Sequence, residues 1–360
     1  MRLVLEARPL PSRLAALTSP LLATLATIVV GYVVFAAFGK DAPRALVAFF
    51  VAPVATRYGI GELLLKAGPL MLIATGLAIG YRANVWNIGA EGQLTLGAIA
   101  GGGIALAIGD AGVPAALVLP AMFVAGALAG MAWAAIPAVL RTRFNANEIL
   151  TSLMLVYVAT YLLSWLIHGP WRDPEGYNFP QSRLFGASAL LPNLLPETRV
   201  NVSLLLALAL VAIAWIFVRR HVIGFEMRVA GLAPAAARYA GISERRNVWI
   251  GMLAGGACAG LAGVAEAAGP IGQLVGSMSP GYGFAAIIVA FLGRLHPGGI
   301  AASSLLMSLL YLGGESAQVH LGLPSAATGL FQGTLLFFLL AADVLIDYRP
   351  RIVHVAANAS

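Results

Sequence analysis

Three carboxylates lie within or at the edge of long apolar stretches, where an ionised side chain is costly unless it has a task. They are Glu91, Glu148 and Glu266. In a membrane, such groups contact a polar solute or relay protons. Each also has a structural explanation. Glu148 follows Asn147 at a helix start, where both residues favour capping. Glu91 can hydrogen-bond the irregular segment before it, and Glu266 can reach water at the end of its apolar run.

Uncharged polar side chains accompany these carboxylates. Asn87, Glu91 and Thr95 are spaced i, i+4, i+8 and would share one face of a helix that starts near Asn87. Later in the chain, Gln273 and Ser277 occupy a Gly/Pro-rich stretch, where they either line a solute path or are solvated. The candidate solute pathway therefore comprises Asn87, Glu91, Gln93, Asn147, Glu148, Glu266, Gln273 and Ser277.

Several other chemistries are missing from the sequence. A P-loop requires Lys followed by Ser or Thr, but Lys40 and Lys66 are followed by Asp and Ala. The five histidines form no H-E-x-x-H motif, and no G-x-S-x-G elbow occurs. A P-loop ATPase is excluded, a zinc or serine hydrolase is not indicated, and no cofactor is expected in this chain. The single cysteine, Cys258, excludes a disulfide framework.

The elements that carry these residues follow from composition. Of 360 residues, 60% are hydrophobic and 10% charged, whereas soluble domains carry about 25% charged residues. Apolar runs of about 20 residues recur, each long enough to cross a hydrocarbon core about 30 Å thick as a helix. Continuous runs such as Leu204–Val218 exclude a transmembrane β-barrel. The sequence predicts an all-α, polytopic membrane helical bundle of about ten transmembrane helices, at residues 20–38, 67–82, 86–108, 114–140, 148–168, 201–219, 248–268, 282–295, 299–313 and 325–346.

The distribution of basic residues predicts the orientation of these spans. With the N-terminus inside, 15 of the 22 Lys and Arg residues lie in inner segments and 7 in outer ones. This excess places both termini in the cytoplasm. The first apolar run follows Arg2, Arg8 and Arg13, as a signal peptide would. Its 18 residues, Leu21–Phe38, exceed the usual signal-peptide core of about 7–15 residues, which favours an uncleaved anchor.

Two stretches interrupt the predicted spans. The apolar part of the second span, Pro69–Gly80, amounts to about 18 Å of helix and is too short to cross alone. The segment Arg82–Gln93 should therefore begin inside the membrane. A second interruption, Gly269–Gly283, precedes the short apolar stretch Phe284–Leu292. Paired broken segments point to the translocation site of a transporter, and the spans predict two pseudo-symmetric, inverted halves.

The chain otherwise reads as one transmembrane domain, residues 1–360, with two notable loops. The outer loop 169–200 carries Trp171, Tyr177 and Phe179 and is predicted to form an ordered extracytoplasmic cap. Small-xxx-small spacings predict close helix contacts. They occur at Gly97/Gly101, Gly126/Gly130, Gly251/Gly255, Gly256/Gly260 and Gly329/Gly333.

The second notable loop is the cytoplasmic segment 220–247, which joins the sixth and seventh spans. It predicts a short helix that starts at Pro234, because proline suits a first helical turn, and that ends near Gly241. The helix would either lie on lipid headgroups or dock on a soluble partner, and Arg238 as its only cation favours the partner.

This insert carries a family resemblance. Gly224–Ile242 resembles the coupling segment of ATP-binding-cassette importer permeases of the sugar, nucleoside and branched-chain amino-acid group. Asn87-Ile-Gly-Ala-Glu-Gly-Gln93 and Ser279-Pro-Gly-Tyr-Gly-Phe284 resemble, more narrowly, permeases of bacterial nucleoside importers that use a binding lipoprotein. The similarity runs from about residue 45 to 345. One departure is Leu232-Ala233 before Pro234, where the family pattern has a polar residue.

The resemblance implies a machine of several subunits in the bacterial inner membrane. It implies a second permease, a related and shorter paralogue, a cytoplasmic ATPase that binds ATP and magnesium, and an extracytoplasmic substrate-binding lipoprotein. Nucleosides would cross by alternating access, without chemical change. Carried over by position, the residues that couple to the ATPase would be Glu226, Arg228, Pro234, Arg238 and Tyr239.

Two alternatives remain open from the sequence. The same kind of permease could carry a pentose or a branched-chain amino acid, because the binding lipoprotein sets much of the specificity. A protein of another class, an ion-coupled secondary carrier or channel, would use Glu91, Glu148 and Glu266 as relay groups.

Overall fold

A computed structural model describes residues 2–8, 12–109 and 111–353. Their contacts divide the chain into two compact units. We call Thr56–Ser308 the core unit, and Met1–Ala55 with Leu309–Ser360 the terminal unit. Among the described residues, nine helices are long and apolar enough to cross a membrane. The predicted polytopic helical bundle is therefore confirmed.

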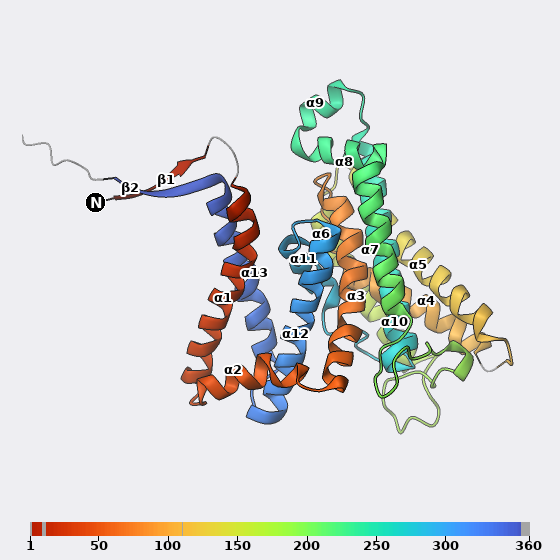
Figure 1. The fold of residues 1–360 in the computed structure, drawn as a ribbon. Coiled ribbons are helices and arrows are strands. Elements are labelled where there is room, and N and C mark those ends of the chain that lie inside the picture. The colour runs from red at the N-terminus through yellow and green to blue at the C-terminus, as the bar shows by residue number, and fades with distance from the viewer. Residues whose placement is uncertain (1, 9–11, 110, 354–360) are drawn as a thin grey trace, which may run out of the picture. The chain divides into compact units, whose positions relative to one another are not determined.

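The core unit contains most of these helices (Figure 1). One end of it carries α8 and α9, and the loop 169–200 lies at the opposite end. Its elements are α3 (Arg57–Tyr81), α4 (Ala90–Ile108), α5 (Ala115–Phe144), α6 (Glu148–His168), η2 (Ala187–Ala189), α7 (Ser203–Arg220), α8 (Val222–Leu232), α9 (Pro234–Tyr239), α10 (Glu244–Glu266), the π-helix η3 (Ala267–Ile271), α11 (Tyr282–Leu292) and the first part of α12 (Pro297–Leu321).

Helix α10 is the centre of the core unit, where it packs against α3, α4 and α5. Glycines allow this approach. A Cβ on Gly260 would lie 2.1 Å from the carbonyl oxygen of Gly126, and one on Gly97 2.3 Å from that of Gly260. The predicted glycine contacts are thus confirmed on α4, α5 and α10. The pair Gly329/Gly333 was predicted wrongly, because nothing lies within 4 Å of a Cβ built there.

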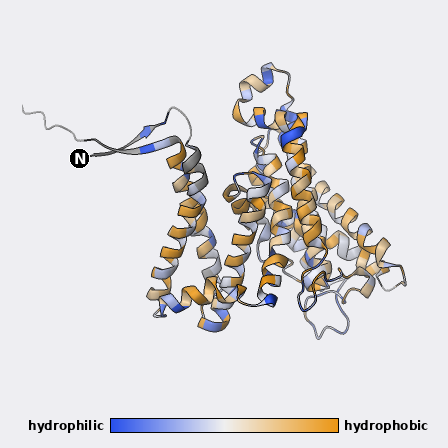
Figure 2. Ribbon diagram, in the orientation of Figure 1, coloured by the Kyte–Doolittle hydropathy of each residue, from blue (hydrophilic) through white to orange (hydrophobic). Residues whose placement is uncertain are grey.

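Hydrophobic residues, orange in Figure 2, make up much of the helices. Some of their apolar side chains lie on the outside. Leu128 on α5 is 58% exposed, Tyr161 on α6 73% and Ile216 on α7 54%. Such surfaces are unfavourable in water and favourable against lipid.

The terminal unit has its own small core. It contains β1 (Arg2–Ala7), α1 (Arg13–Ala37), α2 (Ala42–Phe50), η1 (Ala52–Val54), the later part of α12, α13 (Ala326–Asp347) and β2 (Tyr348–Val353). The rings of Phe49 and Phe331 stack 4.3 Å apart, with Phe35 beside them. Helix α2 and the antiparallel pair β1–β2 were not predicted from the sequence.

Four boundary predictions were wrong. Helix α3 has 25 residues, not a short apolar stretch, because Thr56 caps its start and polar residues continue it. Helix α4 begins at Ala90 instead of near Asn87. The predicted span 282–295 contains only the 11-residue α11, which ends before Arg294 and Leu295, both at positive φ. Helix α12 continues to Leu321.

Candidate functional site: the meeting point of two interrupted segments

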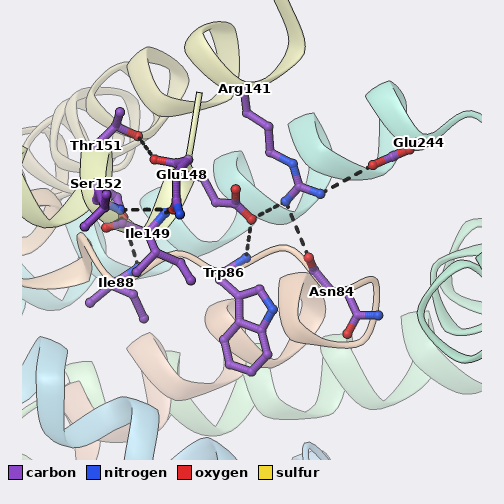
Figure 3. A network of polar contacts seen from close by, with 11 residues as sticks. Asn84, Trp86, Ile88, Arg141, Glu148, Ile149, Thr151, Ser152 and Glu244 are labelled. Atoms are coloured by element: carbon purple, nitrogen blue, oxygen red, sulfur yellow. Dashed lines mark hydrogen bonds and ion pairs between the residues drawn. The ribbon is translucent and has the colours of Figure 1, made fainter. Parts of the chain in front are cut away.

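The first interruption is the irregular segment Arg82–Gly89 between α3 and α4. Neighbouring side chains satisfy its backbone N–H groups, as nonhelical chain at membrane depth requires. The carboxylate of Glu148 accepts the N–H of Trp86 at 3.4 Å, and the Ser152 hydroxyl accepts that of Ile88 at 3.2 Å. Both acceptors lie on the first turns of α6, beside the interrupted chain (Figure 3).

The side chain of Asn87 stabilises the end of this segment that leads into α4. Its amide exchanges two hydrogen bonds with that of Gln93, at 2.8 and 3.0 Å, and both residues are buried. Its oxygen also accepts the N–H of Gly89 at 3.0 Å. Because α4 begins only at Ala90, the predicted shared face with Glu91 and Thr95 was wrong. Asn87 instead shapes the entrance to α4 together with Gln93.

The second interruption is Gly272–Gly281, between η3 and α11. The outer loop pairs with it through main-chain hydrogen bonds, from Ser182 to Leu274 at 2.9 Å and from Phe185 to Gly272 at 2.8 Å. Gln273 contacts Gln181 of that loop at 3.3 Å. Part of the loop 169–200 is thus held by hydrogen bonds to the second interruption, and its extracytoplasmic position stays a prediction.

The second interruption ends in a cap for α11. The Ser279 hydroxyl accepts the N–H groups of Gly281 and Tyr282 at 3.0 and 2.8 Å. The Ser277 hydroxyl donates to the carbonyl of Ser279 at 3.0 Å. This hydrogen bonding positions the α11 N-terminus below the loop.

The two interruptions meet at Glu91. Its carboxylate accepts the N–H of Gly283, in the first turn of α11, at 2.6 Å, and a hydrogen bond from Ser279. The backbones are in close contact, because a Cβ on Gly283 would lie 2.3 Å from the nitrogen of Glu91. Helix α4 leads from here towards the outer loop, where Ser188 bonds Gly109, and α11 leads the opposite way. A carboxylate thus lies between two opposed helix N-termini, whose partial positive charges favour it.

Three aromatic rings fill the space between this contact and the α8 end. Tyr81 and Trp86 both stack on Phe291 of α11, with centroids 5.3 and 5.8 Å apart. Arg82 closes the same end by donating to the carbonyl of Leu295 at 3.2 and 2.5 Å. The first interruption therefore packs against the C-terminal part of α11 and the turn that follows it.

A second buried polar group lies towards the outer end of the core unit. Glu266 is 7% exposed, so the hypothesis of simple exposure was wrong. Lys66 and Arg199 lie close enough to act on its charge. Arg199 also forms a bidentate pair with buried Glu62, at 2.9 and 2.5 Å. This pairing raises the pKa of the Arg199 guanidinium.

Glu62, Lys66 and Arg199 are not among the residues predicted for the solute pathway. The second span was predicted to begin at residue 67, which placed Glu62 and Lys66 in an outer loop. Their i, i+4 spacing, which puts them on one face of α3, was the available signal.

A polar network ties the first interruption to the α8 end (Figure 3). The Arg141 guanidinium pairs with Glu148 and, at 3.5 Å, with Glu244 of α10. It also donates to the carbonyl of Asn84 at 3.4 Å. Asn147 caps α6 by accepting the N–H groups of Ile149 and Leu150, as the capping hypothesis predicted. Asn147 and Glu148 are therefore away from the Glu91 contact.

The predicted cytoplasmic insert contacts the first interruption directly. A Cβ on Gly231 would lie 2.0 Å from the carbonyl oxygen of Arg82, and the Asn84 amide donates to the Gly231 carbonyl at 3.0 Å. Helix α9 begins at Pro234, as predicted, and it ends before Gly241, which has a φ of +77°.

The predicted coupling residues divide into paired and projecting side chains. Glu226 pairs with Arg246 at the start of α10. Tyr239, at the end of α9, is 97% exposed, and Arg238 beside it is also exposed. Arg228 points to a cavity between α7 and α8 that it lines.

A known family and several known proteins resemble this chain along most of its length. The family described as "branched-chain amino acid transport system / permease component" matches residues 59–340. The glucose ABC transporter permease protein TsgB13 of Haloferax volcanii is 38% identical over 95% of this chain and 91% of its own length. The nucleoside ABC transporter permease protein NupB of Lactococcus lactis is 28% identical over 94% of both chains.

Two further relatives bear on assembly. The guanosine ABC transporter permease protein NupP of Bacillus subtilis is 28% identical over 96% of this chain and 99% of its own. A second nucleoside ABC transporter permease of Lactococcus lactis, NupC, is 25% identical over 71% of this chain and 83% of its own. One organism thus has two permeases of different length that both resemble this chain.

Proposed function

The chain belongs to the permease family of branched-chain amino acid transport systems and is the membrane permease subunit of an ABC importer, and we propose that its cargo is a nucleoside, carried inward by alternating access. The permease is a non-catalytic subunit, and ATP hydrolysis belongs to a partner in this family. ATP and magnesium would accordingly be bound by that ATPase.

One observation carries the mechanism: the insert that projects α9 contacts Arg82–Gly89, the segment that leads into α4 and Glu91. Gly231 touches the carbonyl of Arg82, and Asn84 bonds Gly231. A displacement of α8 and α9 therefore acts on Arg82–Gly89 without any flexible linker between them. Because Arg82–Gly89 leads directly into the first turn of α4, which carries Glu91, the displacement reaches the contact with Gly283.

The transport cycle follows from this connection. Closure of the ATPase pair on ATP would move the exposed end of α9, and α8 would move with it. The first interruption would then shift along α11, and the contact between the N-termini of α4 and α11 would open or close the path. The nucleoside would cross without covalent change.

We propose a path that runs from the outer loop to the Glu91 contact. Gln273 and Ser277 would line its outer part, Glu266 with Glu62, Lys66 and Arg199 its polar wall, and Glu91 its narrow point. Asn87, Gln93, Asn147 and Glu148, which are committed to hydrogen bonds around the first interruption, would shape the path from behind.

The partners follow from the family and the relatives. The permease functions with an ATPase and a substrate-binding component. We propose that the second permease is a shorter paralogue, as the pair NupB and NupC suggests, and that the binding component is a lipoprotein. The excess of Arg and Lys in the inner segments supports two cytoplasmic termini in the cell (inner) membrane.

Labelled uptake tests the cargo. Cells that express the complete transporter should accumulate at least one labelled nucleoside faster than cells lacking this gene. The relative TsgB13 makes glucose the second candidate, and a pentose or a branched-chain amino acid can be assayed in parallel. Unchanged uptake of every nucleoside together with gene-dependent uptake of glucose would overturn the nucleoside proposal and leave the importer intact.

An Arg238→Glu variant tests the coupling role of α9. The reversed charge at an exposed side chain should weaken copurification of the ATPase and transport, while the permease still inserts. Arg183→Glu, an equal charge change on the exposed outer loop, is the matched control and should leave both unchanged. Normal ATPase copurification and transport in Arg238→Glu would reject the assignment.

Reconstitution separates the importer from an ion-coupled carrier. Purified alone into vesicles under an ion or proton gradient, this subunit should transport nothing, whereas a secondary carrier that used Glu91, Glu148 and Glu266 as relay groups would transport. Transport without ATPase and ATP would overturn the proposed mechanism.

A further inference from the structure

A cavity of about 630 Å³ lies at the α8 end of the core unit, away from the proposed path. It is enclosed by the C-terminal turns of α7, the inner side of α8 and the turn between α11 and α12. Its charged lining consists of Arg82, Arg219, Arg228, Arg294 and His296, and no Asp or Glu of the described chain lines it. The cavity is therefore strongly basic.

These positive charges act on one another. Burial, and then the charge of Arg228, lowers the pKa of Arg82. Burial, followed by Arg219 and Arg82, lowers the pKa of His296. Glu226, the carboxylate on α8, is paired with Arg246 and does not line the cavity. A bound anion would relieve this repulsion.

The geometry suits a phosphate group better than a carboxylate side chain. The Arg219 guanidinium lies over the Trp215 ring, 5.2 Å from its centroid, and both side chains line the cavity. The Arg82 guanidinium is held by its hydrogen bonds to the Leu295 carbonyl, and both residues also line the cavity. Four arginines, from the end of α3, α7, α8 and the turn after α11, line this one cavity, and several guanidinium groups match an anion with three or more oxygens.

The rim of the cavity is apolar and exposed. Trp215 on α7 is 39% exposed, and Phe225 and Leu232 on α8 are 63% and 77% exposed. The α7 surface below the cavity consists of the apolar side chains that face lipid. A molecule with a phosphate and hydrocarbon chains contacts both the basic lining and the apolar rim. A small hydrophilic phosphate contacts only the basic lining.

We infer that this cavity binds the phosphate of an anionic phospholipid headgroup, with the acyl chains lying along α7. The site would hold α8 against α7 and so set how firmly the coupling insert is held when the ATPase moves. It depends on neither the identity of the cargo nor the docking of α9.

Titration of the purified full-length chain tests the inference. Dioleoylphosphatidylglycerol is added in detergent, and bound lipid is counted by native mass spectrometry. Arg219→Gln should bind this lipid about tenfold more weakly than the wild type, because one charge-assisted contact is lost. Arg220→Gln is the matched control: the same change at the next residue, which is exposed and does not line the cavity, should leave affinity unchanged.

Further arms separate the possible sources of the phosphate. Dioleoylphosphatidylcholine should bind more weakly, and inorganic phosphate or glucose 6-phosphate at millimolar concentration should not displace phosphatidylglycerol. Equal affinity of wild type, Arg219→Gln and Arg220→Gln for phosphatidylglycerol would overturn the site. Arg219-dependent binding of glucose 6-phosphate without binding of the lipid would overturn the lipid assignment. Arg228→Gln should repeat the loss, which guards against a local folding defect at Arg219.

Discussion

The two interruptions in the core unit do the same structural job by different means. Side chains of α6 support the first, Arg82–Gly89, since Glu148 and Ser152 accept its N–H groups. Main chain supports the second, because the outer loop pairs with Gly272–Val275. A support made of side chains can rearrange by rotation about single bonds, whereas a main-chain pairing must break as a unit. The coupling insert contacts the first interruption, which can rearrange. The second interruption would stay in place while the first one moves.

The contact between the two interruptions should be the most sensitive point. Gly283→Ala would place a methyl group 2.3 Å from the backbone nitrogen of Glu91, where no side chain can move aside. Labelled uptake should fall about tenfold or more, since overpacked backbone must shift. Gly329→Ala, with nothing within 4 Å, is the matched control and should transport normally. Wild-type uptake by Gly283→Ala would show that α4 and α11 do not touch.

Glu91 distinguishes a positional role from a charge-dependent one. Glu91→Ala leaves the N–H of Gly283 without an acceptor, at a cost of about 1–3 kcal/mol, and should reduce uptake several-fold. Glu91→Gln keeps an acceptor oxygen and should recover most of the activity. Equal loss in both variants would show that the negative charge itself is required. Membrane abundance, measured by immunoblotting, controls for expression.

A more mobile first interruption should uncouple ATP hydrolysis by the partner subunit from transport of the cargo. Glu148→Ala removes the acceptor of Trp86 and one partner of Arg141, so the segment should become more mobile and less stable by about 2 kcal/mol. We expect faster amide hydrogen exchange across residues 84–89 and ATPase activity that no longer depends on cargo. Exchange that stays slow in this variant would mean that the segment is held by the aromatic stack instead.

The second interruption should tolerate an equivalent change better. Ser182→Ala removes the acceptor of the Leu274 N–H, but the main-chain bond from Ser182 to Leu274 remains. The free energy of unfolding should fall by about 1 kcal/mol. Uptake should stay within twofold of the wild type. An effect larger than that of Glu148→Ala would reverse the assignment of fixed and mobile interruptions.

Much of the site could be predicted from the sequence. The Gly/Pro-rich stretch Gly269–Gly283 marks the second interruption, because that pattern does not continue a helix. The polar run Arg82–Gln93 marks the first, although its last residues, Ala90–Gln93, already belong to α4. The capping by Asn147 follows from its position alone. The sequence could not show that Glu91 bonds Gly283, which lies 192 residues away, or that Glu266 is buried.

What the sequence determined by itself was the solvent and the architecture: a chain with 60% hydrophobic residues in recurrent runs must form membrane-spanning helices, since only lipid accommodates that surface. Local chemistry also determined the start of α9 at Pro234 and its end before Gly241. Tertiary structure alone decided that α3 extends outward through Glu62 and Lys66, because a partner such as Arg199 is needed to bury a carboxylate there. It also decided that two opposed helix N-termini meet on one carboxylate, a long-range contact that no local pattern encodes.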